Sequence, residues 1–272
     1  MKLVLCVAVA SAVALAVFPP RSARSVPPVY NDYRAALMAF VDAQGLVDYA
    51  GLREQRSYID DFVVYLEQVS PKTYAAWPER DQIAFWINAY NALTLRAIID
   101  HYPINPERLN GSYPRNSIRQ IPGVWDIARV NVIGESITLG YIETKHLRRD
   151  FHEPRIHVAL VCAALSCPKL RREPYEGARL DAQLDDQARA FLSDPRHFRI
   201  DAANKKVRVS EIFRWYAEDF APAGTSTKDK QALERTALIT FASPYLGPAE
   251  RALLKDAVIE YAPYDWTLNE QH

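Results

Sequence analysis

The sequence predicts an α+β fold that is mostly helical, with small antiparallel hairpins around one buried central helix. Helical apolar patterns dominate the first hundred residues, and short strand-like segments appear only after them. No regular alternation of strands and helices is visible, which disfavours a doubly wound parallel sheet. The chain has 272 residues, of which 49% are hydrophobic, so it is long enough to bury a full core.

Helices are expected first. Apolar residues recur with helical spacing over residues 30–43 and again over 55–69, with a glycine-bounded connection at 45–52 between them. Residues 79–101 follow Pro78, which suits the start of a helix, and their middle is apolar on nearly every side. Because a helix without a polar face is normally buried, residues 79–101 are predicted to form the centre of the fold.

Two asparagines lie within this central helix. Asn88 and Asn91 are three residues apart and therefore share a face. A buried amide without hydrogen-bond partners costs about 1–3 kcal/mol, so both side chains need partners. Either they bind the backbone of a neighbouring loop and fix its shape, or they line a pocket that faces the segment beginning at His157.

The middle of the chain is predicted to be less regular. Residues 104–122 contain repeated proline and asparagine turn signals, and a long ordered loop of this kind is often functional. A hairpin is predicted from 126–133 and 136–139, turning at Gly134-Glu135. A short helix is expected over 141–148.

The last third is predicted to combine helices with a second hairpin. That hairpin pairs 197–200 with 206–209, and Ser210 is a suitable cap for the helix that follows. The other expected elements are helices over 180–192, 211–220, 230–242 and from 248 onward, and a strand or extended tail over 258–268.

The segment with the most distinctive chemistry is residues 157–168, HVALVCAALSCP. Its apolar run lies between Pro154 and Pro168 and predicts a strand buried on both faces. It begins with His157 and contains Cys162 and Cys167, so nearly all of the chain's thiol chemistry falls within six residues.

The first 25 residues have the pattern of a secretory signal peptide. Lys2 precedes an apolar run over 3–18, and small residues follow it. We expect removal of residues 1–25, with cleavage after Ala16 as the rival, a single mature domain over 26–272, and a periplasmic or secreted location. The alternative is an uncleaved membrane anchor, which is the one case in which a membrane partner is expected.

Export bears on Cys162 and Cys167, because paired cysteines tend to form disulfides in oxidising compartments. A bridge requires the two Cα atoms to lie within about 7 Å, so the chain must turn sharply between them. The sequence leaves both the bridged and the free state open.

The charge balance and the absence of known motifs argue against several classes of function. Lys plus Arg and Asp plus Glu each total 33, which gives no indication of nucleic-acid binding. No dinucleotide fingerprint, phosphate loop or common zinc motif is present, so no cofactor and no metal are expected. Glu211 and Asp219 form either an acid–base pair or ordinary surface charge.

Several blocks resemble the family called domain of unknown function 547, in the family's order. FWINAYNA (85–92) resembles its signature helix, and residues 157–168 are similar to its most characteristic motif. Further similar blocks are Ile142-Glu143 with Leu147-Arg148, SEIFRWY (210–216) with Asp219-Phe220, and YDWTLN (264–269). Thr144 stands where many members have a histidine, so any role of that histidine is absent here.

The resemblance implies an exported bacterial-type protein but no established activity. A central helix followed by a histidine-led segment is also, more distantly, similar to papain-type and transglutaminase-type thiol enzymes. In those enzymes the nucleophilic cysteine begins the central helix, whereas residues 79–101 contain no cysteine. A thiol, if one acts here, is therefore supplied by Cys162 or Cys167.

Two functions remain as expectations. One is a thiol-dependent hydrolase or acyl-transferase-like enzyme acting on a peptide-like or envelope substrate. In it Cys162 or Cys167 is the nucleophile and His157 the base, while Asn88 or Asn91 orients the imidazole or donates to an oxyanion. The other is a non-catalytic exported binding or scaffold module with a Cys162–Cys167 disulfide. The partner is unknown in either case.

Overall fold

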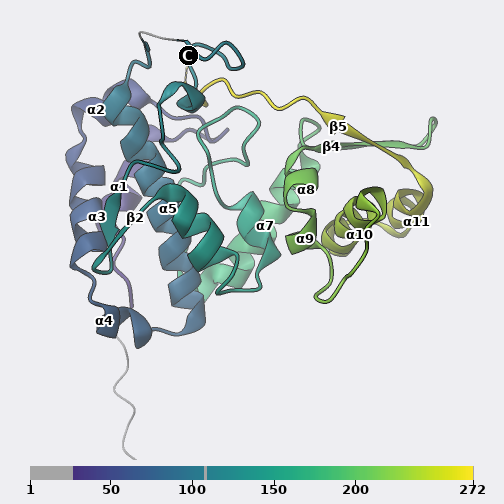
Figure 1. Cartoon of the computed structure of the whole chain (residues 1–272), viewed down its shortest axis with the longest axis horizontal. Coiled ribbons are helices and arrows are strands. Elements are labelled where there is room, and N and C mark those ends of the chain that lie inside the picture. The colour runs from purple at the N-terminus through teal and green to yellow at the C-terminus, as the bar shows by residue number, and fades with distance from the viewer. Residues whose placement is uncertain (1–26, 107–108, 272) are drawn as a thin grey trace, which may run out of the picture.

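The computed structural model describes residues 27–106 and 109–271, and it has the α+β class that the sequence predicts (Figure 1). The expected signal peptide over 1–25 lies outside the described residues. Within the described part of the chain, no helix is both long enough and apolar enough to span a bilayer.

The first part of the chain packs helices around the long helix α5 (Glu79–His101), whose bounds are those predicted from the sequence. Residues on all sides of α5 are buried from Ile83 to Ile99, which confirms its central position. Around it lie α1 (Asn31–Phe40), α2 (Tyr49–Glu54), α3 (Ser57–Gln68) and α4 (Pro71–Ala75). Helix α2 was expected to be a connection; the Asp48 carboxylate begins it by accepting the Gly51 N–H at 2.8 Å.

The middle segment contains the predicted long loop and hairpin. The hairpin turns at Ile133-Gly134, one residue earlier than predicted, and both residues have positive φ, as a two-residue turn of this kind requires. The helix expected over 141–148 begins earlier and continues as a turn of π-helix. The elements are η1 (Ile118–Gln120), β1 (Val130–Val132), β2 (Glu135–Ile137), α6 (Leu139–Tyr141) and the π-helical turn η2 (Ile142–Leu147).

Residues 157–168 do not form the predicted strand. The segment begins in the 3₁₀ helix η3 (Pro154–Val158) and continues as irregular backbone. Its burial was predicted correctly, but its polar backbone groups are satisfied partly by side chains and partly by the backbone of the C-terminal segment, where the Leu165 N–H binds the Thr267 carbonyl at 2.8 Å. Asn91 binds the Ala159 carbonyl and the Val161 N–H, and Ala163 has a φ of 59°. The apolar run therefore predicted burial but not secondary structure, because this segment is a buried loop and not a buried strand.

The last part follows the predicted order. Strands β3 and β4 form the expected antiparallel hairpin, and β5 pairs with β4 in parallel, giving the order β3-β4-β5. The helix predicted over 211–220 is split at Tyr216. The elements are η4 (Gly177–Arg179), α7 (Leu180–Ser193), β3 (Phe198–Asp201), β4 (Lys206–Ser210), α8 (Ile212–Trp215), α9 (Ala217–Phe220), α10 (Lys230–Ala242), η5 (Ser243–Tyr245), α11 (Pro248–Asp256) and β5 (Val258–Ala262).

The buried residues form two hydrophobic cores. The first surrounds α5 and the second lies among β3, β4, α8, α9 and α10. Helix α7 belongs to both, because Leu184 packs in the first core and Ala188 in the second. Figure 1 shows α7 between the helices around α5 and the pair α10 and α11.

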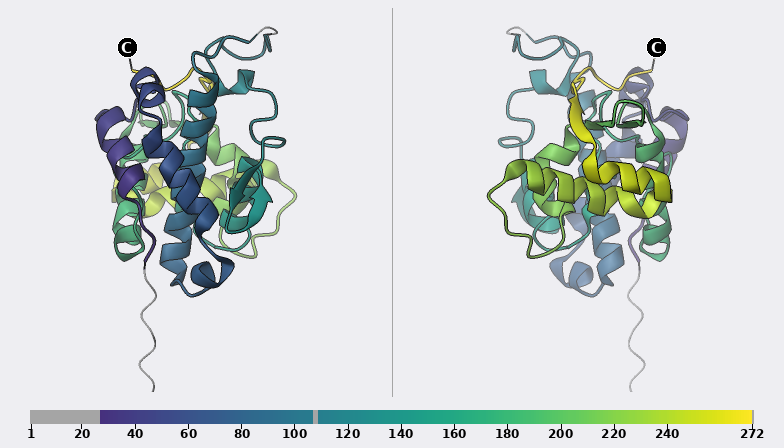
Figure 2. Two further views of the ribbon diagram at one scale, coloured as in Figure 1. Left: turned by 90° about the vertical axis from the view of Figure 1, so that its left-hand side faces the viewer. Right: turned by 90° about the vertical axis from the view of Figure 1, so that its right-hand side faces the viewer.

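The C-terminal segment returns from the second core to the first. Figure 2 shows β5 leading away from α11 and the chain then crossing toward the helices of the first part. There the Leu268 N–H binds the Asn116 carbonyl at 2.9 Å, and the Gln271 N–H binds the Val47 carbonyl at 3.0 Å. Residues 264–271 are therefore a second connection between the two cores, in addition to α7.

Candidate functional site

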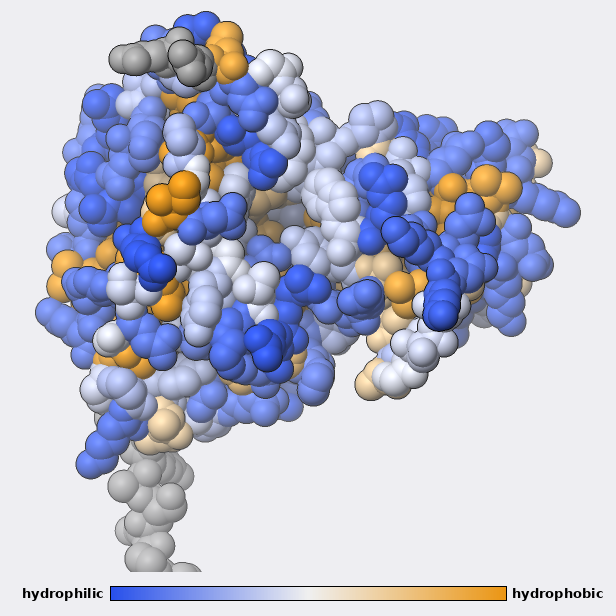
Figure 3. Space-filling model, viewed as in Figure 1, coloured by the Kyte–Doolittle hydropathy of each residue, from blue (hydrophilic) through white to orange (hydrophobic). Residues whose placement is uncertain are grey.

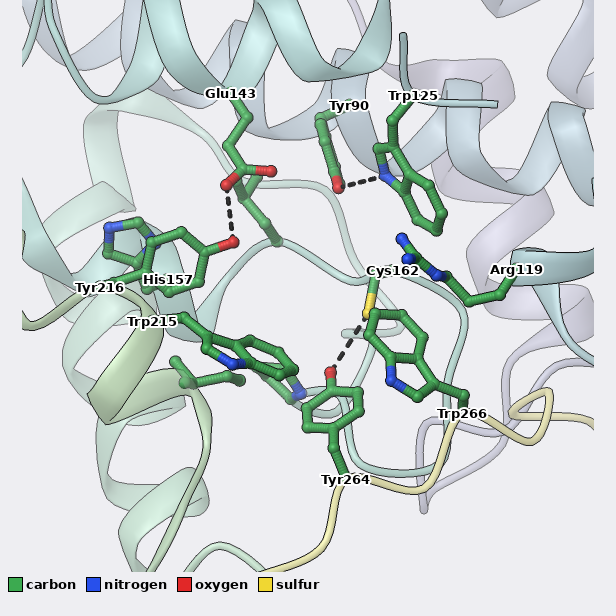
Figure 4. Close-up of a pocket in the computed structure, with 13 residues that line it drawn as sticks. Tyr90, Arg119, Trp125, Glu143, His157, Cys162, Trp215, Tyr216, Tyr264 and Trp266 are labelled. Atoms are coloured by element: carbon green, nitrogen blue, oxygen red, sulfur yellow. Dashed lines mark hydrogen bonds between the residues drawn. The ribbon is translucent and has the colours of Figure 1, made fainter. Parts of the chain in front are cut away.

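A cavity of about 280 Å³ lies where the two cores meet, and we call it the aromatic cavity. The space-filling view shows the surface hollowed between the two halves of the molecule (Figure 3). The wall is mostly aromatic (Figure 4). Its rings are those of Tyr90, Trp125, Trp215, Tyr216, Tyr264 and Trp266.

Both cores and the returning C-terminal segment supply this wall. Tyr90 extends from the buried middle of α5, and Trp215 and Tyr216 extend from the end of α8. Tyr264 and Trp266 follow β5, so their positions depend on the segment that crosses between the cores. Rings from such distant parts of the sequence form a preorganised apolar surface, as ligand sites commonly do.

One carboxylate faces the aromatic cavity. Glu143 is held by the π-helical turn η2, a rare geometry that is often found at functional sites. Its carboxylate accepts a hydrogen bond from the Tyr216 hydroxyl at 2.7 Å. Burial, and then the charge of Glu143, raises the pKa of Tyr216 and of Tyr90, so both phenols stay protonated. Among the described residues, no basic side chain forms an ion pair with Glu143 within 4 Å.

One guanidinium, that of Arg119, also faces the aromatic cavity. The Arg119 guanidinium carbon lies 4.5 Å from the Tyr113 ring, 5.3 Å from the Trp125 ring and 5.1 Å from the Trp266 ring. These are cation–π distances, and Arg119 also donates to the Tyr113 hydroxyl at 2.6 Å. In the described ranges no carboxylate lies within 4 Å of this guanidinium.

His157 lies behind Tyr216 and is almost completely buried, with 1% of its side chain exposed. Its ring stacks on Tyr216 with 3.9 Å between centroids, and its Nε2 lies 2.7 Å from Asp219 Oδ2. Asp219 also accepts a hydrogen bond from Arg148 at 3.2 Å. Burial lowers the pKa of His157 and outweighs the opposing effect of Asp219, so the ring is neutral.

Asp219 is charged, whereas its partner His157 is neutral. Burial alone disfavours its charge, but hydrogen bonds from His157 and Arg148 together lower its pKa to about 2. The carboxylate is therefore ionised at neutral pH, and Nε2 of His157 carries the proton that it donates. Of the two acids considered from the sequence, Asp219 is part of this buried cluster, whereas Glu211 pairs with Arg214 at 2.6 Å.

Cys162 and Cys167 form a disulfide, with their Cα atoms 6.2 Å apart. Cys162 is part of the cavity wall, and its sulfur lies 3.2 Å from the Tyr264 hydroxyl. The sulfur of Cys167 accepts the Cys162 N–H at 3.0 Å. His157 also lines the cavity, but within the described chain its ring hydrogen-bonds to Asp219 and to neither sulfur.

Both asparagines bind loop backbone. Asn88 donates to the Tyr175 carbonyl at 2.7 Å and accepts its N–H at 2.9 Å. Asn91 donates to the Ala159 carbonyl at 3.0 Å and accepts the Val161 N–H at 2.9 Å. These contacts match the interpretation in which the amides fix the shape of neighbouring loops. Neither asparagine is among the residues that line the aromatic cavity.

Sequence reasoning did not single out the charged and aromatic cavity residues. Glu143, Trp215, Tyr216, Tyr264 and Trp266 each fall in a block that resembles the family, and that was their one signal. Arg119 lies in the long loop predicted to be functional, but nothing in its sequence context distinguishes it from the loop's other arginines, Arg108 and Arg115. No group of three or more His, Cys, Asp or Glu side chains in the described part is placed to hold a metal ion.

Comparison with known proteins gives one match. A family model described as "Protein of unknown function, DUF547" matches residues 74–192, from α4 to the end of α7. No curated protein and no solved structure matches the chain. The matched region contains Tyr90, Arg119, Glu143 and Cys162 of the cavity wall. By this match, residues 74–192 of the chain belong to the DUF547 family.

Proposed function

We propose that this protein is an exported, non-catalytic binding module that holds a small organic ligand in the aromatic cavity. The observation that carries the proposal is a wall of six aromatic rings that surrounds one acidic and one basic side chain, neither of them in an ion pair among the described residues. Ligand sites are commonly apolar clefts with a few polar groups at fixed positions, and this cavity has that composition.

Two features favour binding over catalysis. The disulfide leaves neither Cys162 nor Cys167 as a thiolate, which is the form that attacks a substrate. His157 is neutral and buried, and Asp219 occupies its Nε2. Arranged in this way, the two groups stabilise the wall of the cavity but do not react.

The export part of the proposal is supported by the leader-like pattern of residues 1–25 and by the disulfide, which persists best in an oxidising compartment. N-terminal sequencing of protein isolated from the cell envelope tests it. We expect a mature chain that begins near residue 26. Recovery of an intact Met1 from the cytosol would contradict export.

Binding is tested with four single-ring probes: benzyl alcohol, phenethylamine, 3-phenylpropionate and L-phenylalanine. Three tryptophans line the cavity, so occupancy should change intrinsic fluorescence in a saturable way, and isothermal titration measures the affinity. We expect at least one probe to bind to the wild type and to bind at least tenfold more weakly to Trp215→Ala.

A matched control is available for this substitution. Tyr141 is 42% exposed and Trp215 is 43% exposed, but Tyr141 lies outside the aromatic cavity. Tyr141→Ala should therefore leave the affinity unchanged. Failure of all four probes to bind, or equal losses in the two variants, would count against the proposed site.

A second function has one observation in its favour. Cys162 lies in the cavity wall beside the Tyr264 hydroxyl, so reduction of the bridge would bring a thiol to the same cavity. On this hypothesis the protein is a thiol-dependent hydrolase or acyl-transferase-like enzyme for amide or peptide-like substrates.

Iodoacetamide labelling of the reduced protein across pH tests the thiol hypothesis. An activated cysteine would titrate well below the free-thiol pKa of about 8.5, and His157→Ala would abolish that depression. Labelling that follows an ordinary thiol curve in both proteins would exclude catalysis through Cys162 or Cys167.

A further inference from the structure

We propose that the ligand of the aromatic cavity is a small zwitterion, an amino acid or a very short peptide with an apolar side group. Glu143 binds its ammonium group and Arg119 binds its carboxylate. The inference rests on the proposed binding function and names the chemical class of the ligand. Its basis is that the cavity presents one carboxylate and one guanidinium, each without an ion-pair partner in the described chain.

Charge balance favours a ligand with both signs. A charge that a bound ligand removes from water is costly unless an opposite charge or good hydrogen bonds on the ligand meet it. A cationic ligand would satisfy Glu143 but leave Arg119 against an apolar group, and an anionic ligand would do the reverse. A zwitterion satisfies both, and it leaves the net charge of the site unchanged.

The acidic side of the cavity suits an ammonium group. Figure 4 shows the Glu143 carboxylate above the rings of Tyr216 and Trp215, with its oxygens directed toward the cavity. The hydroxyls of Tyr216 and Tyr90 both interact with this carboxylate, and a carboxylate has about four acceptor sites. Acceptor positions therefore remain for an ammonium group, and the adjacent ring faces add cation–π attraction.

The basic side suits a carboxylate. Arg119 enters the cavity from a different side than Glu143, next to Trp266 (Figure 4). Three aromatic rings and the Tyr113 hydroxyl fix its guanidinium plane, so little side-chain freedom remains to be lost on binding. A planar guanidinium with free N–H groups binds a carboxylate through two parallel hydrogen bonds, and a fixed plane makes that geometry selective.

The cavity volume limits the ligand. At about 280 Å³ the cavity is near the lower end of the range for small-molecule sites, which suits one or two amino-acid residues. The rest of the wall includes Trp125, Leu160, Trp215 and Tyr264, which would contact an apolar or aromatic side group.

The decisive experiment compares ligands that differ by one charge. Isothermal titration at pH 7 is performed with L-phenylalanine, glycyl-L-phenylalanine, phenethylamine and 3-phenylpropionate. Phenethylamine lacks the carboxylate, and 3-phenylpropionate lacks the ammonium group. We expect the tighter of the two zwitterions to bind at least tenfold more tightly than either singly charged analogue.

Two variants assign the charges to their residues. Glu143→Gln should weaken the zwitterion and phenethylamine at least tenfold and should not weaken 3-phenylpropionate. Arg119→Gln should weaken the zwitterion and 3-phenylpropionate and leave phenethylamine unchanged. The controls are Glu218→Gln and Arg208→Gln, which remove one exposed acid and one exposed base outside the cavity. Thermal melting establishes that each variant is folded.

The outcomes separate this inference from the function on which it rests. If a singly charged analogue or benzyl alcohol binds as tightly as the zwitterions, the zwitterion assignment is wrong and the binding function stands. If the zwitterions bind but neither cavity variant changes their affinity, the assignment of the two residues is wrong. If none of the compounds binds, both proposals are wrong.

Discussion

The two hydrophobic cores bury polar side chains of different kinds. The first core buries amides, and Asn88 and Asn91 each exchange a pair of hydrogen bonds with loop backbone. The second core buries two imidazoles, His157 and His197, which stack on Tyr216 and Phe191. Amides carry no charge at any ordinary pH, whereas imidazoles do when protonated, so the second core should be the more sensitive to acid.

The contrast has one exception. His146 lies at the edge of the first core, stacked on Trp86 with 4.0 Å between centroids. Burial lowers its pKa too, but 13% of its side chain is exposed, and Glu135 and Asp150 lie nearby. Water and these acids can accommodate a proton at His146 more easily than the interior can at His157.

The largest effect is expected where an amide fixes a loop of the first core. Asn91→Ala leaves the Ala159 carbonyl and the Val161 N–H buried without partners, so we expect a loss of about 4 kcal/mol in the free energy of unfolding. Urea denaturation at pH 7 measures it. The control Asn204→Ala, in an exposed turn, should cost far less. A loss below about 1 kcal/mol at Asn91 would contradict the role assigned to the amide.

The next largest expected effect is a loss of unfolding free energy in acid, and it arises from His197 in the second core. Burial lowers the pKa of His197 to about 4, so between pH 6.5 and about 4 the unfolded chain binds a proton that the folded chain does not. The stabilisation is complete above pH 6.5 and falls as the pH decreases, by about 3 kcal/mol in total.

Replacement of the ring tests this prediction. His197→Phe keeps an aromatic ring on Phe191 and removes the titrating group, so the fall in stability between pH 6.5 and 4 should become smaller. His152→Phe, at an exposed position, serves as the control and should leave the slope unchanged. Equal slopes for wild type and His197→Phe would show that His197 is protonated easily in the folded protein.

The disulfide lies in the segment that passes between the cores. Because it closes a short loop, the Cys162→Ser/Cys167→Ser double variant should lose about 2 kcal/mol of unfolding free energy under oxidising conditions. Serine hydroxyls can still accept the hydrogen bonds that the sulfurs accept, so the difference reports mainly the covalent constraint. In a reducing buffer wild type and variant should be equally stable, and a persistent difference would contradict this account.

The smallest effect is expected at Asp219. Its pKa of about 2, against an ordinary 3.8, means that it stabilises the fold fully above pH 4 and loses this contribution as the pH falls toward 2. Its side chain is 25% exposed and asparagine retains an acceptor, so Asp219→Asn should cost about 1 kcal/mol at pH 7. The cost should vanish near pH 2, and a cost independent of pH would mean that charge is not its source.

Helical elements were the most predictable part of the chain. The apolar pattern of residues 79–101 determined both the bounds and the burial of α5, because a helix apolar on all sides has few places in a fold. The two hairpins were predictable from local turn chemistry, with an error of one residue at Ile133-Gly134. The conformation of the segment after His157 was not predictable, because the groups that satisfy its backbone come from distant parts of the chain, Asn91 and residues 265–269.

The candidate site was predictable only in part. The sequence indicated Cys162 and His157, and both line the aromatic cavity. It could not indicate that Asp219 is the partner of His157, because the two are 62 residues apart and no local pattern connects them. Glu143 and Arg119 are ordinary charged residues in sequence, and they become distinctive only because no ion-pair partner lies within 4 Å of either in the described structure.

The wall of the aromatic cavity also has a consequence for folding kinetics. Its residues range from Tyr90 in α5 to Trp266 beyond β5, so its contacts are among those of longest sequence separation. Contacts of this kind form late, after the loops between them have closed. An intermediate with an intact first core but an undocked 264–271 segment would have near-native helix content and no assembled aromatic cavity. On the proposed binding function, recovery of ligand affinity during refolding should therefore lag behind recovery of the helical signal.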